Sequence, residues 1–177
     1  FLAVTKLKLL RVEVVPGSYD LVFARKERQV ILYQDCLEGR ELSSGPGNSK
    51  ILLGRNEENN DVVYYNLDSE DPHALIGGMT KSGKSVLLNI FIVDLMRTNT
   101  VDELKLILVD PKQVEFTRYN GIPYLDKDGI ITKKDLAIEK LHSVVAEMER
   151  RYSLFAEAGV NELSKYNKKI ETKLPRI

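Results

Sequence analysis

The sequence contains little cysteine, no tryptophan and no excess of charge of either sign. Cys36 is the only cysteine among 177 residues, so an internal disulfide is excluded and a reduced thiol is expected. No group of cysteine and histidine residues has the spacing of a metal site. Lysine plus arginine equals aspartate plus glutamate at 26 each. No overall field therefore favours a polyanionic partner, and contact with nucleic acid would need local patches or assembly.

Long hydrophobic runs and targeting signals are also absent. The longest apolar stretch, around residues 86–96, is interrupted by Asn89 and Asp94, whereas a membrane span needs roughly 18 or more apolar residues. No signal peptide is evident. We therefore expect a soluble piece of a longer protein, long enough for one domain or for one domain and part of another, with any membrane anchor outside it.

The composition changes near residue 70. Residues 1–70 contain short β-type runs separated by turn residues, which predict a β-rich segment. The predicted strands are Leu9–Val15, Leu21–Phe23, Val30–Tyr33, Ile51–Leu53 and Val62–Tyr65. Residues 71–177 alternate strand and helix, which predicts a doubly wound α/β domain with its ligand at the carboxyl ends of the strands.

The central motif lies between a predicted buried strand, Ala74–Ile76, and a predicted apolar helix, Val86–Met96. Gly78, four intervening residues and then Gly83-Lys-Ser85 give the spacing of a P-loop. Backbone N–H groups of such a loop and the positive end of the following helix bind phosphates. The predicted nucleotide-binding residues are Gly78, Met79, Thr80, Lys81, Ser82, Gly83, Lys84, Ser85 and Val86. We expect Lys84 to reach the β- and γ-phosphates of ATP as the catalytic lysine, and the Ser85 hydroxyl to hold Mg²⁺.

An acid follows the next predicted strand, Leu104–Asp110. Asp110 is the only acid at the end of a strongly apolar strand after the loop. In one interpretation it is the Walker B acid that completes the magnesium site. In the other it belongs to an accessory strand, and the Walker B strand begins after Leu174. The pattern of apolar residues does not decide between them.

A long helix is predicted towards the end of the chain. Apolar residues recur at helical spacing, and we expect them to be buried along one face. They are Leu141, Val144, Val145, Met148, Tyr152 and Phe155. Thr132 with Asp135 predicts a capping box, and Gly159 predicts the end of the helix. Glu147 and Arg151 predict an exposed ion pair, and residues 161–169 predict another short helix.

Several motifs together resemble the FtsK/SpoIIIE DNA translocases. After the stretch from His73 to Ser85 they occur in the order seen in that family: Leu108-Val-Asp-Pro-Lys112 with Glu115, Tyr119-Asn-Gly-Ile-Pro-Tyr124, Glu147-Met-Glu-Arg-Arg-Tyr152 and Gly159-Val-Asn-Glu-Leu-Ser-Lys-Tyr-Asn167. Upstream, residues 12–17 and 26–32 resemble the segment that precedes the family's motor. The family commonly has glycine at the position of Lys81, so we expect Lys81 to point to solvent and to avoid a backbone conformation restricted to glycine.

The resemblance implies a P-loop NTPase with a RecA-like parallel-sheet core at 71–177, preceded by a small β-rich linking domain at 1–70. It implies ATP and Mg²⁺ as cofactors, double-stranded DNA as partner and a homo-hexameric ring. It also implies a cytoplasmic motor domain that a segment outside these residues could tether to the bacterial membrane. Asp110 and Lys112 would then be an accessory motif, the Walker B strand would lie beyond Ile177, and this piece alone would be inactive.

Two other functions fit parts of the pattern. One is a protein-export ATPase of the type VII secretion kind, built on the same fold. The other is a nucleotide kinase or a GTP-binding switch that uses Asp110. The guanine-reading pattern Asn-Lys-x-Asp is missing, because Asn167-Lys-Lys-Ile170 lacks the acid. We therefore favour an ATP-driven DNA translocase for chromosome segregation or for the transfer of plasmid or mobile-element DNA.

Overall fold

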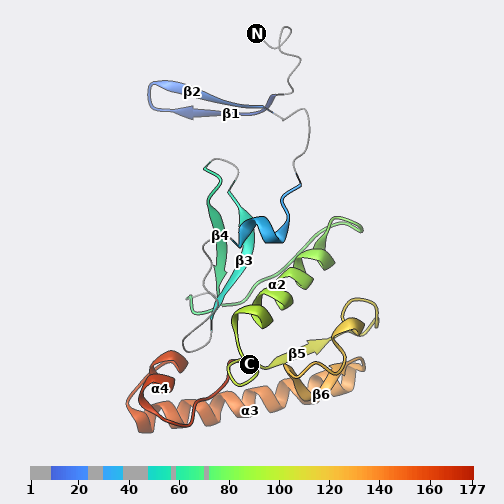
Figure 1. Cartoon of the computed structure of the whole chain (residues 1–177), viewed down its shortest axis with the longest axis vertical. Helices are drawn as coiled ribbons and strands as arrows, with labels where there is room; N and C mark the ends of the chain where they lie inside the picture. The colour runs from blue at the N-terminus through green and yellow to red at the C-terminus, as the bar shows by residue number, and fades with distance from the viewer. Residues whose placement is uncertain (1–8, 24–29, 38–47, 57–58, 70–71) are drawn as a thin grey trace. The chain divides into compact units, whose positions relative to one another are not determined.

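The computed structural model describes residues 9–23, 30–37, 48–56, 59–69 and 72–177 (Figure 1). The chain divides into two compact units, Phe1–Asp35 and Cys36–Ile177. The charged turn at 25–28 and most of the loop at 43–49 lie outside the described residues, as does part of the upstream segment at 26–32. Within the described residues no helix is both long and apolar enough to cross a membrane.

The first unit contains one antiparallel hairpin, β1 (Leu9–Val15) and β2 (Ser18–Phe23). Pro16 and Gly17 form its turn. Gly17 adopts a φ of 86°, which glycine reaches without the steric cost that a residue with a side chain would have after the proline. The two predicted strands are confirmed. The predicted strand at 30–33 is wrong. Asp35 accepts a hydrogen bond from the Leu32 N–H at 2.9 Å and returns one to the Leu32 carbonyl, which closes a turn and starts the short 3₁₀ helix η1 (Tyr33–Cys36).

The second unit begins with the hairpin β3 (Lys50–Arg55) and β4 (Val62–Asn66), as predicted. Helix α2 (Lys84–Thr98) packs against β3, where Ile51, Leu95 and Leu104 form a buried cluster. The fully buried Asp94 on α2 accepts the Leu52 N–H at 2.8 Å. This packing puts β3 and β4 in one compact unit with α2. The predicted domain boundary between residues 70 and 71 stays a prediction.

A parallel sheet follows, made of β5 (Leu106–Val109) and β6 (Leu125–Ile131). On the other side of β5, the Lys105 N–H donates to the Arg176 carbonyl at 2.7 Å and the Arg176 N–H donates to Glu103 at 2.8 Å. Residue 176 therefore forms an isolated parallel bridge with Leu104, just before β5. The α/β fold class and the strand before Asp110 are confirmed. Strand β6 was not predicted, because its first half is charged.

The last two helices are α3 (Lys134–Ala158) and α4 (Leu163–Lys169), both at predicted places. Gly159 ends α3 in the left-handed conformation, and the Val160 N–H bonds to the Phe155 carbonyl at 2.9 Å, as in a Schellman motif. The predicted capping box is wrong. Lys133 occupies the N-cap and no side chain caps the helix, so Asp135 stands one residue too early for the box.

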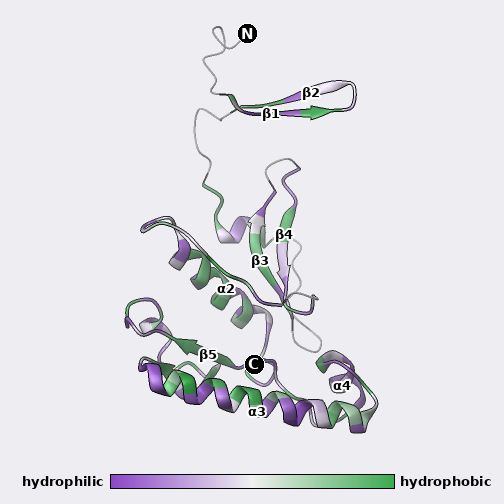
Figure 2. Cartoon of the chain, turned by 180° about the vertical axis from the view of Figure 1, so that it is seen from behind, coloured by the Kyte–Doolittle hydropathy of each residue, from purple (hydrophilic) through white to green (hydrophobic). Residues whose placement is uncertain are grey.

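The predicted buried face of α3 is wrong for most of its residues. Phe155 is buried against Tyr166 of α4, with ring centroids 5.3 Å apart, and Val144 is half-buried. The other predicted core residues are exposed: Leu141, Val145, Met148 and Tyr152. Figure 2 shows α2 as hydrophobic along most of its visible length, whereas α3 alternates between apolar and polar residues.

Charged side chains make the contacts of α3 instead. Lys140 forms ion pairs with Asp126 and Asp128 of β6. Arg151 bonds to Glu147 and donates to the Pro175 carbonyl at 2.7 Å, and its side chain is only 13% exposed. Hydrogen bonds from Arg150 and from Arg151 hold the pKa of Glu147 at about 2, against the opposing effect of burial. The expected exposed ion pair is therefore part of a contact with the end of the chain.

This distribution predicts unequal effects for two apolar substitutions on α3. Phe155→Ala should lower the free energy of unfolding by about 3–5 kcal/mol, because it empties a buried site. Leu141→Ala should change it by about 0.5 kcal/mol or less, as at other surface positions. Urea melts of both variants measure the difference. Equal losses would show that the stripe around Leu141 is covered in solution.

Candidate phosphate-binding site

The segment before the loop is extended but not part of a sheet. The predicted buried strand Ala74–Ile76 is wrong: Leu75 is 99% exposed, and no strand in the described part of the chain pairs with it. A strand of a parallel sheet depends on hydrogen bonds to neighbours, and an apolar run of three residues cannot supply them by itself. The sequence pattern showed that these residues are apolar, but it could not show whether a neighbouring strand pairs with them.

The start of α2 has the features of an anion-binding helix end. The helix begins at Lys84, after Gly83 in a left-handed conformation with φ 95°, and no side chain caps it. Its first hydrogen bond joins the Leu87 N–H to the Gly83 carbonyl at 3.0 Å. The N–H groups of residues 84–86 have no partner in the part of the chain that the structure describes. Such groups, together with the helix dipole, favour a bound phosphate.

The loop itself is exposed and tightly turned. Residues 77–84 are exposed and Ser85 is half-buried, so the nine predicted nucleotide-binding residues form one continuous accessible segment. The Ser82 N–H donates to the Met79 carbonyl at 3.1 Å. A Cβ atom at Gly78 would collide with the Ser82 hydroxyl oxygen, so any other residue there would force the Ser82 side chain to move.

Lys81 is exposed, as expected, but its φ of 65° lies in the left-handed region that favours glycine. This region favours glycine but is not restricted to it, so a lysine can occupy the position. Residues other than glycine reach this region at a cost of roughly 1–2 kcal/mol. The loop therefore holds a lysine in a conformation that glycine would adopt without this cost.

Asp110 lies at the end of β5 and is 4% exposed. Its carboxylate accepts the N–H groups of Glu115 at 2.9 Å and Phe116 at 3.1 Å. Burial acts to raise the pKa of Asp110, but these backbone hydrogen bonds outweigh it and hold that pKa below its ordinary value. Asp110 thus closes the loop at 111–116, while Lys112 in that loop is exposed.

Two residues that the sequence analysis did not select connect this loop to α2. The Tyr119 hydroxyl, from the 3₁₀ helix η2 (Thr117–Tyr119), donates to the Asn89 side-chain oxygen at 2.6 Å. The Asn89 amide nitrogen donates to the Ser85 carbonyl at 2.7 Å. The start of α2 and the loop after β5 also lie on the same side of the molecule, at the right of Figure 1 and at the left of Figure 2. A polar residue inside an apolar helix was the available signal for Asn89.

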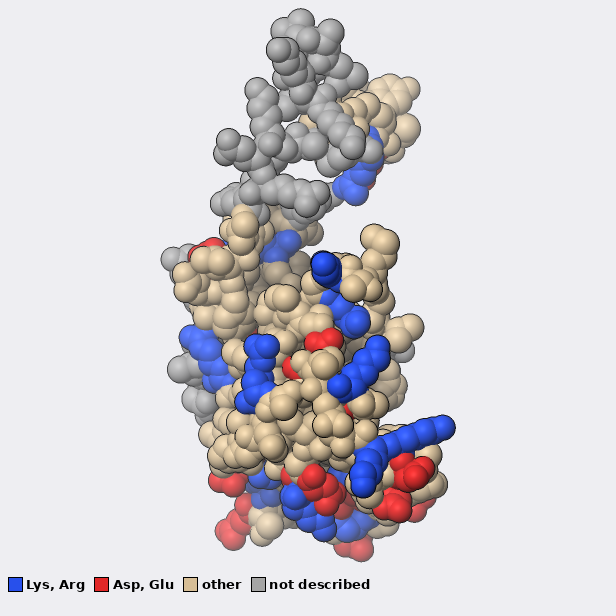
Figure 3. Space-filling view, turned by 90° about the vertical axis from the view of Figure 1, so that its right-hand side faces the viewer, with Lys and Arg blue, Asp and Glu red and all other residues tan. Residues whose placement is uncertain are grey.

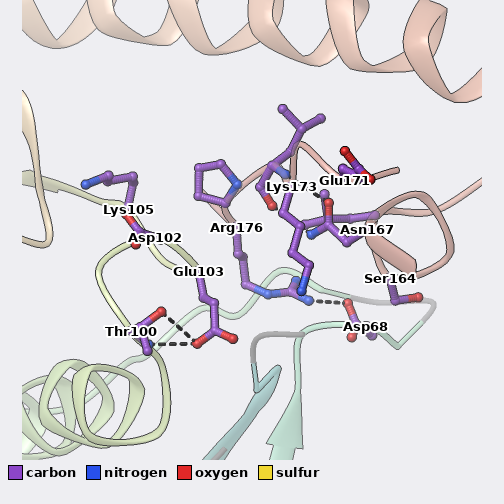
Figure 4. Close-up of a pocket in the computed structure, with 13 residues that line it drawn as sticks. Asp68, Thr100, Asp102, Glu103, Lys105, Ser164, Asn167, Glu171, Lys173 and Arg176 are labelled. Carbon is purple, nitrogen blue, oxygen red and sulfur yellow. Dashed lines mark hydrogen bonds and ion pairs between the residues drawn. The ribbon is translucent and has the colours of Figure 1, made fainter. Parts of the chain in front are cut away.

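A separate polar cavity of about 570 Å³ lies near the beginning of β5, by the connection from α2. Figure 4 shows Arg176 directed at Asp68, with their ion pair 2.6 Å long, and Thr100 bonded to Glu103. Burial raises the pKa of Asp68, but hydrogen bonds from Ser49 and Arg176 more than offset it. Acidic and basic side chains both line the cavity, so it has no clear preference for phosphate. None of the predicted site residues lines it.

The described residues contain no metal-type cluster, and the face drawn in Figure 3 has no large patch of one charge. No group of three or more His, Cys, Asp or Glu residues in the described part of the chain is placed to hold a metal ion. Figure 3 shows one face with separate Lys and Arg side chains over its middle, and with acids and bases mixed near α3 at the bottom. The charges on this face therefore do not by themselves mark a nucleic-acid surface.

Comparison with known proteins identifies relatives over most of the chain. The FtsK/SpoIIIE family profile matches residues 34–176, which nearly coincide with the second compact unit. DNA translocase FtsK of Pseudomonas syringae pv. tomato is 36% identical over 172 residues, covering 96% of this chain and 21% of the relative. DNA translocase FtsK of Lactiplantibacillus plantarum is 38% identical over 166 residues, covering 92% of this chain and 20% of the relative. The chain thus spans about a fifth of the length of the curated relatives it matches.

One solved structure supports the fold. The pCW3 conjugation coupling protein TcpA, in its monomer form with ATPγS, matches with a TM-score of 0.70 and 24% identity. The match covers 99% of this chain and 47% of that one. At this level of identity the likeness supports the α/β fold, and it adds nothing about ligands of the present chain.

The positive φ of Lys81 can be tested with two substitutions at that position, one of which serves as the control. Lys81→Gly should raise the free energy of unfolding by up to about 1 kcal/mol, because glycine adopts positive φ without a steric cost. Lys81→Ala removes the same charge but keeps a Cβ atom, so it should give no such gain. Urea midpoints of the three proteins measure this. An equal gain in both variants would assign the effect to the charge and not to the backbone.

Proposed function

This chain belongs to the FtsK/SpoIIIE family, and from that premise we propose that it is the phosphate-binding part of an ATP-driven motor that translocates double-stranded DNA. The observation that carries the proposal is the uncapped start of α2, where N–H groups without a partner among the described residues stand beside the exposed Lys84 and the Ser85 hydroxyl. Relatives that are DNA translocases cover nearly the whole chain. The same motor would serve chromosome segregation and the transfer of plasmid or mobile-element DNA.

The residues fit MgATP in their chemistry. The N–H groups of residues 84–86 and the Lys84 ammonium are donors for phosphate oxygens, and the Ser85 hydroxyl is an oxygen ligand of the kind that Mg²⁺ accepts. When bound, magnesium would neutralise charge on the phosphates. The chain's own residues bind and orient the phosphates in a loop where Gly78 leaves room for the Ser82 hydroxyl.

Asp110 fits the accessory role better than the magnesium role. Its carboxylate already accepts two backbone N–H groups, and it is nearly inaccessible. Residue 176 forms a parallel bridge with Leu104, just before β5, so a chain that continued from it would run towards the same edge of the sheet as Asp110. We therefore place the Walker B acid on that continuing strand. A hexameric ring and a tether to the bacterial membrane belong to the same proposal.

DNA-stimulated ATP turnover is the direct test. In a protein that contains these residues together with the remainder of its motor, duplex DNA should raise the rate of ATP hydrolysis. Lys84→Ala should lower nucleotide affinity roughly ten- to hundredfold, because it removes a charged hydrogen bond to phosphate. Circular dichroism should show the variant folded, since Lys84 is exposed. Turnover that ignores DNA but responds to a secreted protein substrate would favour the protein-export function.

The isolated chain should behave differently. Residues 1–177 should bind a fluorescent ATP analogue weakly and hydrolyse ATP far below about one turnover per second, because arginine-finger-type charges from a neighbour can be worth roughly 10³–10⁵ in rate. An assay of the isolated chain and of Asp110→Ala measures this. Turnover of about one per second or more in the chain, lost in Asp110→Ala, would identify Asp110 as the magnesium acid and contradict the accessory role.

A further inference from the structure

A continuous set of hydrogen bonds runs from the end of β5 to the first turn of α2. The Asp110 carboxylate holds the N–H groups of Glu115 and Phe116. The Phe116 carbonyl accepts the Tyr119 N–H at 2.9 Å, and their rings lie 6.4 Å apart. The Tyr119 hydroxyl then reaches Asn89, and Asn89 reaches Ser85.

Each member of this set has little freedom to move. Tyr119 is 5% exposed and packs with Ile92 and Leu108, so its ring direction is fixed by the core. The Asn89 oxygen faces the tyrosine hydroxyl and its nitrogen faces the Ser85 carbonyl, which fixes the orientation of the amide. In a helix the Ser85 carbonyl also accepts the N–H of residue 89, so Asn89 holds that carbonyl twice.

Ser85 is therefore held through its carbonyl, which in a helix points away from the N–H groups of the first turn. The N–H groups at the start of α2 have no partner among the described residues, so no contact there fixes the first turn before a phosphate binds. We propose that Tyr119 and Asn89 are positioning residues of the phosphate site, which orient Ser85 for the phosphate-bound metal and couple the site to the loop at 111–119. This proposal rests on the proposed function of the same site.

The coupling has to act in both directions. If the loop at 111–119 favours the binding-competent first turn, bound nucleotide must favour the ordered loop by the same factor. Occupation of the phosphate site would thus be felt at the exposed residues after Asp110, among them Lys112. Among the described residues, the Tyr119 hydroxyl bond to Asn89 joins α2 to this loop and to no other segment.

The chain offers a matched control for the test. Tyr124 also bonds to α2 through its hydroxyl, but at the other end, to the carbonyls of Met96 at 2.9 Å and Asn99 at 2.8 Å. Tyr119→Phe and Tyr124→Phe each remove one hydroxyl from a tyrosine packed on the same helix. A structural role alone would make the two variants behave alike towards nucleotide.

The measurements use the full 177-residue chain, titrated with ATPγS in the presence and in the absence of Mg²⁺. Tyr119→Phe should weaken binding with Mg²⁺ about three- to tenfold, as for the loss of one hydrogen bond, and should reduce the gain in affinity that Mg²⁺ gives. Tyr124→Phe should stay within about twofold of the unaltered chain, well below the effect of one hydrogen bond. Asn89→Ala should match Tyr119→Phe, and the double variant should lose no more than either one.

Hydrogen exchange supplies a second readout. Without nucleotide, amides of residues 87–90 should exchange faster in Tyr119→Phe than in Tyr124→Phe. Bound nucleotide should protect residues 113–119 in the unaltered chain and in Tyr124→Phe, but not in Tyr119→Phe. Equal affinities and equal exchange in the two tyrosine variants would overturn the positioning role. If the unaltered chain and Lys84→Ala both fail to bind ATPγS, the proposed function fails, and a difference in exchange at residues 87–90 still decides whether Tyr119 holds the first turn.

Discussion

The first N–H groups of α2 have no partner among the described residues, as the proposed phosphate site requires, and this constrains how the helix can be held. Gly83 provides no side-chain cap, so the start of the helix gains nothing from capping. The helix is fastened along its sides instead. Asn89 bonds towards Tyr119, and the buried Asp94 takes the N–H of Leu52. The two polar residues that interrupt the apolar helix thus both bond to neighbouring elements.

Asp110 is likewise a polar residue whose hydrogen bonds hold a neighbouring segment in place. An acid at the carboxyl end of a parallel strand is well placed for a magnesium ion, but the Asp110 carboxylate is nearly inaccessible, and one of its oxygens already accepts two backbone N–H groups. The backbone hydrogen bonds lower its pKa despite its burial, which keeps it charged and holds the loop closed. Its position suits catalysis, but its contacts organise the surrounding loop.

Helix α3 shows a different balance. Its contacts to β6 and to residue 175 run through Lys140 and Arg151, and the stripe from Leu141 to Tyr152 remains exposed. Exposed apolar area on this scale does not favour folding, so the helix depends on charged contacts and on Phe155 at its end. Such ion pairs contribute modestly where solvent reaches them.

The sequence by itself determined the family, the α/β class, the P-loop and the ends of most elements, because these depend on local spacing and on residues such as Gly83 and Gly159. It could not determine which apolar residues are covered. Burial of Ala74–Ile76 or Leu141 requires a neighbour distant in sequence, and periodicity does not specify one. Only the tertiary structure decided that Asp110 serves its own loop, that Lys81 adopts a left-handed conformation and that Tyr119 reaches Asn89 across 30 residues, because these depend on contacts and dihedral angles that only folding fixes.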